Sequence, residues 1–214
     1  MASRMMHLAV SAELEKQLPI KDKNRFRIGH ILPDAIPADK SGHRASHFKA
    51  EPRPGKRMMD FDRFYRQFED QIADELYLGY YFHLIQDAIY RKLMYEEWKI
   101  VYSTDARMML YQDYRILNGV LARRYGLADD LTVPEHFSRE KILAVYPFEL
   151  DFFLQELAGD FAEVGQGQLT FLTEARAEQY VEECAAVCLQ ALAALSRNGP
   201  RLDPTEYAWE ALRE

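Results

Sequence analysis

Cysteine is scarce in this chain, since its 214 residues include only Cys184 and Cys188. The two lie four residues apart in an apolar stretch, where a disulfide within one helix would have poor geometry. Small buried core residues are the usual role of such cysteines. The chain also lacks an apolar run of about 20 residues that could cross a membrane and a secretory signal at its start. We therefore expect a cytoplasmic protein without a transmembrane segment.

An excess of basic charge is absent as well. The net charge is −7 and the isoelectric point is near 5.5, which argues against a stable complex with nucleic acid, because such binders are usually basic. Hydrophobic residues make up 48% of the chain, enough to build a core without disulfides at this length. We expect one domain over residues 1–214, and the sequence leaves the oligomeric state open.

Alternating strand patterns are nearly absent, whereas apolar residues recur at helical spacing along most of the chain. The predicted helices cover approximately residues 3–18, 21–29, 60–94, 104–125, 149–164 and 173–196, with shorter ones after Pro134 and Pro204. Gly29 is expected to end the second helix, and Gly79 marks a joint at which the long third segment could divide. The pattern predicts an all-α, single-domain multi-helix bundle.

The segment 33–57 is the exception, because it is rich in proline and shows no sustained periodicity. It carries six basic residues against three acidic ones, and long irregular segments in helical domains are often functional. We predict a basic irregular loop that forms one wall of a site for a small anionic or phosphorylated substrate, with Arg44 and Lys49 as contacts. The alternative is a solvated basic loop. Arg91 and Lys92 are further possible phosphate contacts, although such residues more often belong to a solvated helix end.

His83 and Asp87 are the most informative pair in the sequence. They are spaced i, i+4 on the apolar stripe of the predicted long helix, so an imidazole and a carboxylate face the core one turn apart. A carboxylate in a core is costly unless it is paired or bound to a metal. The pair therefore indicates a metal site, and a buried hydrogen-bonded couple is the alternative.

Three upstream residues could complete such a site. His7 lies on the apolar face of the first predicted helix, Asp34 follows Pro33 beyond a helix end, and His47 lies in the basic segment. Taken singly, each has an ordinary explanation as a core histidine, a turn former or a loop residue. Imidazole and carboxylate together suit zinc, but also iron, manganese or nickel, so these alternatives stay open.

Four short motifs together resemble the zinc-dependent phospholipase C family and, more distantly, the fungal zinc-dependent single-strand nucleases. The motifs are His7-Leu-Ala, Phe26-Arg-Ile-Gly-His-Ile-Leu-Pro-Asp34, Ser46-His47-Phe48 and Gly79-Tyr-Tyr-Phe-His83-Leu-Ile-Gln-Asp87. They fall within the first 95 residues. The resemblance implies an all-α fold whose zinc ions activate water for phosphodiester hydrolysis.

Carried over by position, the resemblance makes Asp34, His47, His83 and Asp87 a central zinc site. It places His7 on a second metal bridged by Asp87, and it makes Asp34 the candidate general base. The family carries further histidine and glutamate ligands downstream, whereas His136 is the only later histidine here. We therefore expect one zinc ion or two, with no ligand from His136.

A second histidine, His43, precedes His47 by four residues and could replace it as a ligand, although the Ser46-His47-Phe48 context favours His47. The predicted function is that of a metal-dependent, zinc-type phosphoesterase of unknown substrate, in which metal-activated water attacks a phosphoester bond. One alternative is a non-catalytic helical binding module that keeps a structural metal. Another is a helical interaction domain without metal.

Overall fold

The computed structural model describes residues 2–37, 42–101, 103–162, 165–196 and 201–210. In these ranges the chain forms eight α-helices and one two-stranded sheet, so the predominantly helical fold that we predicted is confirmed. The helices are α1 (Arg4–Glu15), α2 (Lys23–Ile31), α3 (His43–Ser46), α4 (Phe61–Gln67), α5 (Glu75–Lys92), α6 (Thr104–Tyr125), α7 (Leu150–Ala162) and α8 (Glu174–Ser196). No helix in these ranges is long and apolar enough to cross a membrane.

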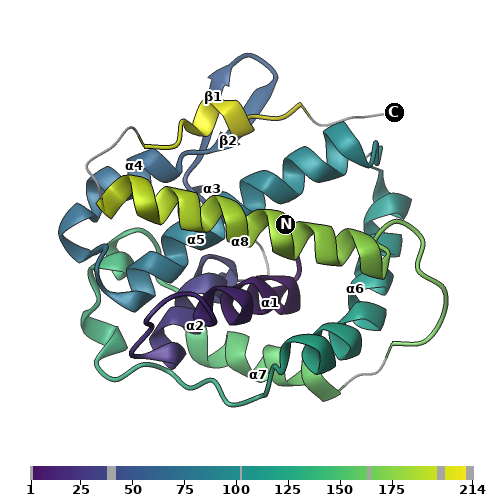
Figure 1. Cartoon of the computed structure of the whole chain (residues 1–214), viewed down its shortest axis with the longest axis horizontal. Coiled ribbons are helices and arrows are strands. Elements are labelled where there is room, and N and C mark those ends of the chain that lie inside the picture. The colour runs from purple at the N-terminus through teal and green to yellow at the C-terminus, as the bar shows by residue number, and fades with distance from the viewer. Residues whose placement is uncertain (1, 38–41, 102, 163–164, 197–200, 211–214) are drawn as a thin grey trace.

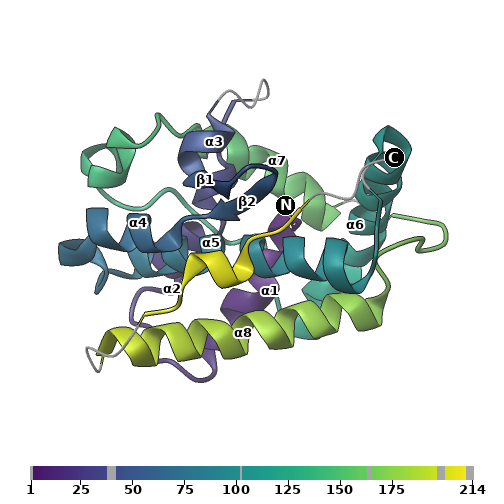
Figure 2. The same ribbon diagram turned by 90° about the horizontal axis from the view of Figure 1, so that it is seen from above.

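Helix α5 is the centre of the molecule. Every residue from 76 to 90 is buried, and a helix that is buried on all sides belongs in the interior of a fold. Figures 1 and 2 show α5 behind the long helix α8, with α1 and α2 beside it, and α5 packs against both α2 and α8. The elements that surround α5 are the ones that carry the upstream histidines and carboxylates.

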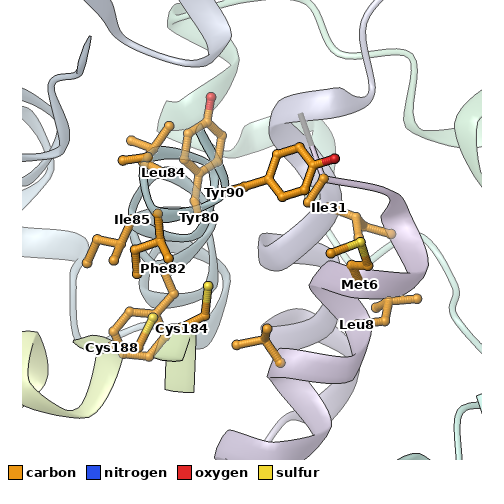
Figure 3. Packing of buried hydrophobic residues seen from close by; sticks show 14 of the residues in the cluster. Met6, Leu8, Ile31, Tyr80, Phe82, Leu84, Ile85, Tyr90, Cys184 and Cys188 are labelled. Carbon is orange, nitrogen blue, oxygen red and sulfur yellow. The ribbon is translucent and has the colours of Figure 1, made fainter. Parts of the chain in front are cut away.

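The apolar core joins α5 to its neighbours. Figure 3 shows Phe82 and Ile85 of α5 on the side where Cys184 and Cys188 of α8 lie, while Met6 of α1 and Ile31 lie on another side of the core. Both cysteines are buried and unpaired, as predicted for small core residues.

Helices α2 and α5 approach each other at two glycines. A Cβ atom on Gly29 would lie 2.3 Å from the Leu76 carbonyl oxygen, and one on Gly79 would lie 2.3 Å from the Phe26 carbonyl oxygen. The predictions of a helix end at Gly29 and a joint at Gly79 were therefore wrong. Each glycine lies inside its helix and is required because the two backbones touch there.

The long predicted segment 60–94 does divide, but earlier than expected. Helix α4 ends at Gln67, and α5 starts at Glu75 after Asp74, whose side chain accepts a hydrogen bond from the Leu76 amide. The prediction for 104–125 is confirmed, with Ser103 as its N-cap and Gly126 in the left-handed conformation at its end. The predicted helix after Pro134 is replaced by two short 3₁₀ turns.

The prediction of an irregular loop over 33–57 was wrong for most of the described part of that segment. A 3₁₀ turn covers Leu32–Asp34, α3 follows, and β1 (Lys49–Arg53) pairs antiparallel with β2 (Lys56–Met59). In a two-stranded sheet both strands are edges, and a proline such as Pro52 of β1 is tolerated there. Residues 38–41 of this segment, including Lys40, lie outside the described ranges.

Candidate metal centre

The structure brings together all five residues that the sequence predicts as metal ligands. His7 comes from α1, Asp34 from the turn after α2, His47 from the end of α3, and His83 and Asp87 from α5. Two overlapping groups, one of His7, His83 and Asp87 and one of Asp34, His47 and His83, have ligand atoms within 4.8 Å of one another. These groups could hold a metal ion.

His83 is oriented by the end of helix α2. Its Nδ1 lies 2.7 Å from the carbonyl oxygen of His30, which is in the last turn of α2, where carbonyls lack a helical partner. A carbonyl can only accept, so Nδ1 carries the hydrogen. Burial lowers the pKa of His83 well below 6.5, so the ring is neutral and Nε2 presents a lone pair.

His7 and His47 are oriented in a similar way. The Nδ1 of His7 lies 2.8 Å from Oε1 of Gln86, and the Nδ1 of His47 lies 2.9 Å from Oγ of Ser46. The Ser46 hydroxyl donates to the His43 carbonyl, so it accepts from His47. Burial lowers the pKa of His47 to about 3. With both Nδ1 atoms donating, the Nε2 atoms of these rings keep their lone pairs, and such outer contacts are typical of metal-binding histidines.

The lone pairs and carboxylate oxygens face one another. The Nε2 of His47 lies 3.3 Å from Nε2 of His83, 3.2 Å from Oδ1 of Asp34 and 3.6 Å from Oδ2 of Asp87. The Nε2 of His7 lies 3.7 Å from Oδ1 of Asp87. Several of these buried atoms have no hydrogen-bond partner, namely His7 Nε2, Asp34 Oδ1 and Asp87 Oδ2. Unpartnered acceptors in contact are costly, and a cation among them would remove that cost.

The spacing of these atoms fits a tetrahedral ion. Zinc binds nitrogen and oxygen at about 2.0–2.1 Å with tetrahedral angles, so two ligand atoms on one ion lie roughly 3.3–3.4 Å apart. The three distances from His47, at 3.2, 3.3 and 3.6 Å, are close to this value. The donor types and their spacing therefore fit a metal ion held by Asp34, His47 and His83, and Asp87 lies beside this group with Oδ2 3.6 Å from Nε2 of His47.

Asp87 is held in its ionised form. Its Oδ1 accepts a hydrogen bond of 3.1 Å from the Ala2 amide. Burial acts to raise the pKa of Asp87, but nearby positive charge outweighs burial and holds the pKa well below 3.8. Its two oxygens point to different histidines, Oδ1 to His7 and Oδ2 to His47, an arrangement that suits a bridging carboxylate.

An open cleft of about 1540 Å³ adjoins the cluster, and Asp34 is the cluster member that lines it. Among the described lining residues, basic side chains outnumber carboxylates, although the whole chain has a net charge of −7. The basic residues are Arg4, Arg44, Lys49, Arg57, Arg91, Arg107 and Arg115, and the carboxylates are Asp34, Glu51, Glu156 and Asp160. The predicted contacts Arg44 and Lys49 both line this cleft. Their role as substrate contacts stays a prediction.

The structure distinguishes between residues that the sequence left ambiguous. His43 lines the cleft and packs on the ring of His47 at 3.9 Å between centroids, but it belongs to neither candidate ligand group. His136 is exposed, and its Nε2 lies 3.2 Å from a carboxylate oxygen of Glu135. Lys92 is exposed, as expected for a solvated helix end.

Arg91 is the main functional candidate that sequence reasoning undervalued. It lies half-buried in the cleft wall, one turn after Asp87 on the same face of α5. The signal was present, because His83, Asp87 and Arg91 are spaced by four. Gln86, Ser46 and the His30 carbonyl were not predicted as partners of the histidines, since such contacts depend on how separate helices pack.

No protein-family model matches this chain, and neither the curated proteins nor the solved structures include a match.

Proposed function

We propose that this protein is a metal-dependent phosphoesterase that uses zinc and has the architecture of the zinc-dependent phospholipases C. The observation that carries the proposal is the cluster of three imidazole lone pairs and two carboxylates beside a cleft lined mainly by basic side chains. A bound zinc ion would activate water and stabilise negative charge on phosphoryl oxygens.

The residues of the chain have separate roles in this proposal. Asp34, His47 and His83 would hold one ion and leave a fourth position for water, and His7 with Asp87 offers a place for another. Asp34 lies at the boundary between cluster and cleft, where a carboxylate can accept a proton from an attacking water.

The basic side chains of the cleft serve the substrate. Arg44 and Lys49 line the same cleft as Asp34, and all three belong to the part of the chain that follows α2. They are positioned to contact phosphoryl oxygens, because arginine and lysine provide strong charge-assisted hydrogen bonds to phosphate.

A non-catalytic binding module with a structural metal is the second candidate. Structural zinc sites are closed by four protein ligands, whereas catalytic sites keep a position for water or substrate. The observation that favours catalysis is that Asp34 is shared between the cluster and a large open cleft.

Elemental analysis of the purified protein, before and after dialysis against a chelator, tests the metal site. We expect about one or two equivalents of zinc, lost in the His83→Ala and Asp87→Ala variants and retained in the control variant His136→Ala. Removal of the metal with a chelator should abolish hydrolysis of p-nitrophenyl phosphate or bis-p-nitrophenyl phosphate. Addition of zinc should restore it. A protein that takes up no metal contradicts the proposal, and a metal-loaded protein that hydrolyses neither ester supports the binding-module alternative.

A further inference from the structure

Two basic side chains flank the candidate metal centre. Lys49 starts β1 two residues after His47, and Arg91 lies one helical turn after Asp87. Both are half-buried, both line the cleft, and their positive charges are close enough to act on each other. The site therefore contains two neighbouring cations beside its carboxylates.

Neither cation forms an ion pair with a carboxylate among the described residues. The carboxylates that act on their charge include Asp34 and Asp87, which are themselves candidate metal ligands. Among the described residues, Arg91 donates to the hydroxyl of Tyr95, at 3.3 Å, while its Nε is buried and has no hydrogen-bond partner there. By contrast, Arg4 in the same cleft is neutralised by Asp160 at 2.7 Å and Glu156 at 3.3 Å. Partly buried cations without such partners are costly, which indicates a site that an anion completes.

A charge count suggests how much negative charge the anion brings. With one divalent ion bound, Asp34 and Asp87 together balance its charge, and the positive charges of Lys49 and Arg91 are left without compensation. The other basic residues of the cleft that form no ion pair with a described residue are exposed to water and do not enter this count, namely Arg44, Arg57, Arg107 and Arg115. A ligand with two negative charges would therefore neutralise the buried part of the site.

We propose that Lys49 and Arg91 form an oxyanion subsite beside the metal centre, and that this subsite selects dianionic phosphomonoesters over phosphodiesters. The inference rests on the proposed function and deepens it. A phosphomonoester is mostly a dianion at neutral pH because its second pKa is about 6, whereas a diester carries one negative charge. In hydrolysis the water oxygen bonds to phosphorus, the ester P–O bond breaks with its electron pair on the alcohol oxygen, and the proton taken by Asp34 passes to that alcohol.

Calorimetric titration with inorganic phosphate tests the subsite directly. The titration compares the native protein with Arg91→Met, which keeps the length of the side chain and removes the charge, and with the control Lys92→Met, whose exposed side chain is adjacent in sequence but does not line the cleft. We expect Arg91→Met to weaken phosphate binding about tenfold or more, the range of hydrogen bonds to charged groups, and Lys92→Met to leave it unchanged. Thermal unfolding confirms that both variants fold.

The same titration is run on chelated and on metal-loaded protein, so the subsite is tested whether or not the protein binds metal. Phosphate binding that is weakened by Arg91→Met but not by Lys92→Met in at least one form supports the subsite. Binding that is equal in all three proteins, or absent in both forms, overturns it. A failure to take up metal overturns the proposed function, and the phosphate titration of the chelated protein still decides the subsite.

Kinetics with p-nitrophenyl phosphate and bis-p-nitrophenyl phosphate test the selectivity. We expect a higher kcat/KM for the monoester, and we expect Arg91→Met to reduce that preference through KM for the monoester. A native enzyme with an equal or higher kcat/KM for the diester overturns the selectivity while leaving the proposed phosphoesterase activity in place.

Discussion

Asp34 is the residue at which the metal cluster and the cleft meet, and the proposed chemistry depends on its carboxylate. Its Oδ1 is 3.2 Å from His47 and has no hydrogen-bond partner. The geometry suits Asp34 both as a metal ligand and as a proton acceptor. An experiment therefore has to separate its effect on kcat from its effect on metal binding.

Asp34→Asn keeps an oxygen for the metal and removes the basicity of the carboxylate. We expect kcat to fall by about 10²-fold or more, the usual contribution of a general base, while His83→Ala loses the metal itself. Measurement of kcat alongside the metal content of each variant distinguishes these effects. An Asp34→Asn enzyme with native kcat would exclude Asp34 as the base.

Asp113 on α6 shows a buried carboxylate with a purely structural role. It accepts hydrogen bonds from the backbone amides of Thr170, Phe171 and Leu172 at 2.8–2.9 Å, and it thereby fixes the segment that leads into α8. Unlike Asp87, it needs no cation, because three N–H groups satisfy it.

Asp113→Asn should destabilise the fold without changing metal content. The amide group would turn a donor toward backbone donors, which costs on the order of 1–3 kcal/mol, whereas Asp129→Asn, at an exposed loop position, should be neutral. Urea unfolding of both variants is the measurement. Equal stability of Asp113→Asn and the native chain would show that these hydrogen bonds add nothing.

At the scale of elements, the close crossing of α2 and α5 builds the centre. It brings the His30 carbonyl to Nδ1 of His83, and Asp34, just after α2, lies 3.2 Å from His47 at the end of α3. The glycines therefore serve the site indirectly, since any added atom at the crossing would separate the two helices.

Gly79→Ala should weaken both the fold and the metal site. Its new Cβ would lie 2.3 Å from the Phe26 carbonyl, and such overpacking costs roughly 1–3 kcal/mol. Gly159→Ala in α7 is the matched control, because nothing lies within 4 Å of its Cβ and alanine favours a helix by up to about 1 kcal/mol. Thermal unfolding and zinc affinity are the measurements, and a Gly79→Ala protein as stable as the control would contradict the close crossing.

At the scale of the whole molecule, the buried histidines couple folding to pH. Burial lowers the pKa of His30 and His47 to about 3 and that of His83 well below 6.5. The unfolded chain therefore binds more protons than the folded chain between these values and 6.5, so the stabilisation is complete above about pH 6.5 and is lost as the pH falls.

Acid should therefore destabilise the chelated protein. We expect the free energy of unfolding to fall below about pH 6.5, by up to about 1.4 kcal/mol per pH unit for each such histidine. Zinc should raise the unfolding midpoint at neutral pH, because a ligand that binds only the folded state stabilises it. Urea titrations at several pH values, with and without zinc, measure both effects. A chelated protein with constant stability from pH 7 to pH 5 would contradict the neutral, buried state of these rings.

The sequence by itself determined the helical class and the set of candidate ligands. Helical periodicity is a local property, and the spacing of His83 and Asp87 places them on one face of α5 whatever that helix packs against. His7 and Asp34 were predicted from a resemblance to a known family, not because any spacing required them to meet.

The tertiary structure decided what the local pattern could not. Gly29 was interpreted as a helix end and Gly79 as a possible break between helices, since a sequence does not show that two backbones touch. The hairpin of β1 and β2 was missed, because its prolines conceal any alternation. For Arg91 the sequence left a phosphate contact and a solvated helix end both open, whereas packing of α5 in the interior brings it into the cleft. The orientation of each imidazole depends on carbonyl, amide and hydroxyl partners, which for His83 and His7 come from other helices, and only the folded arrangement of those helices supplies them.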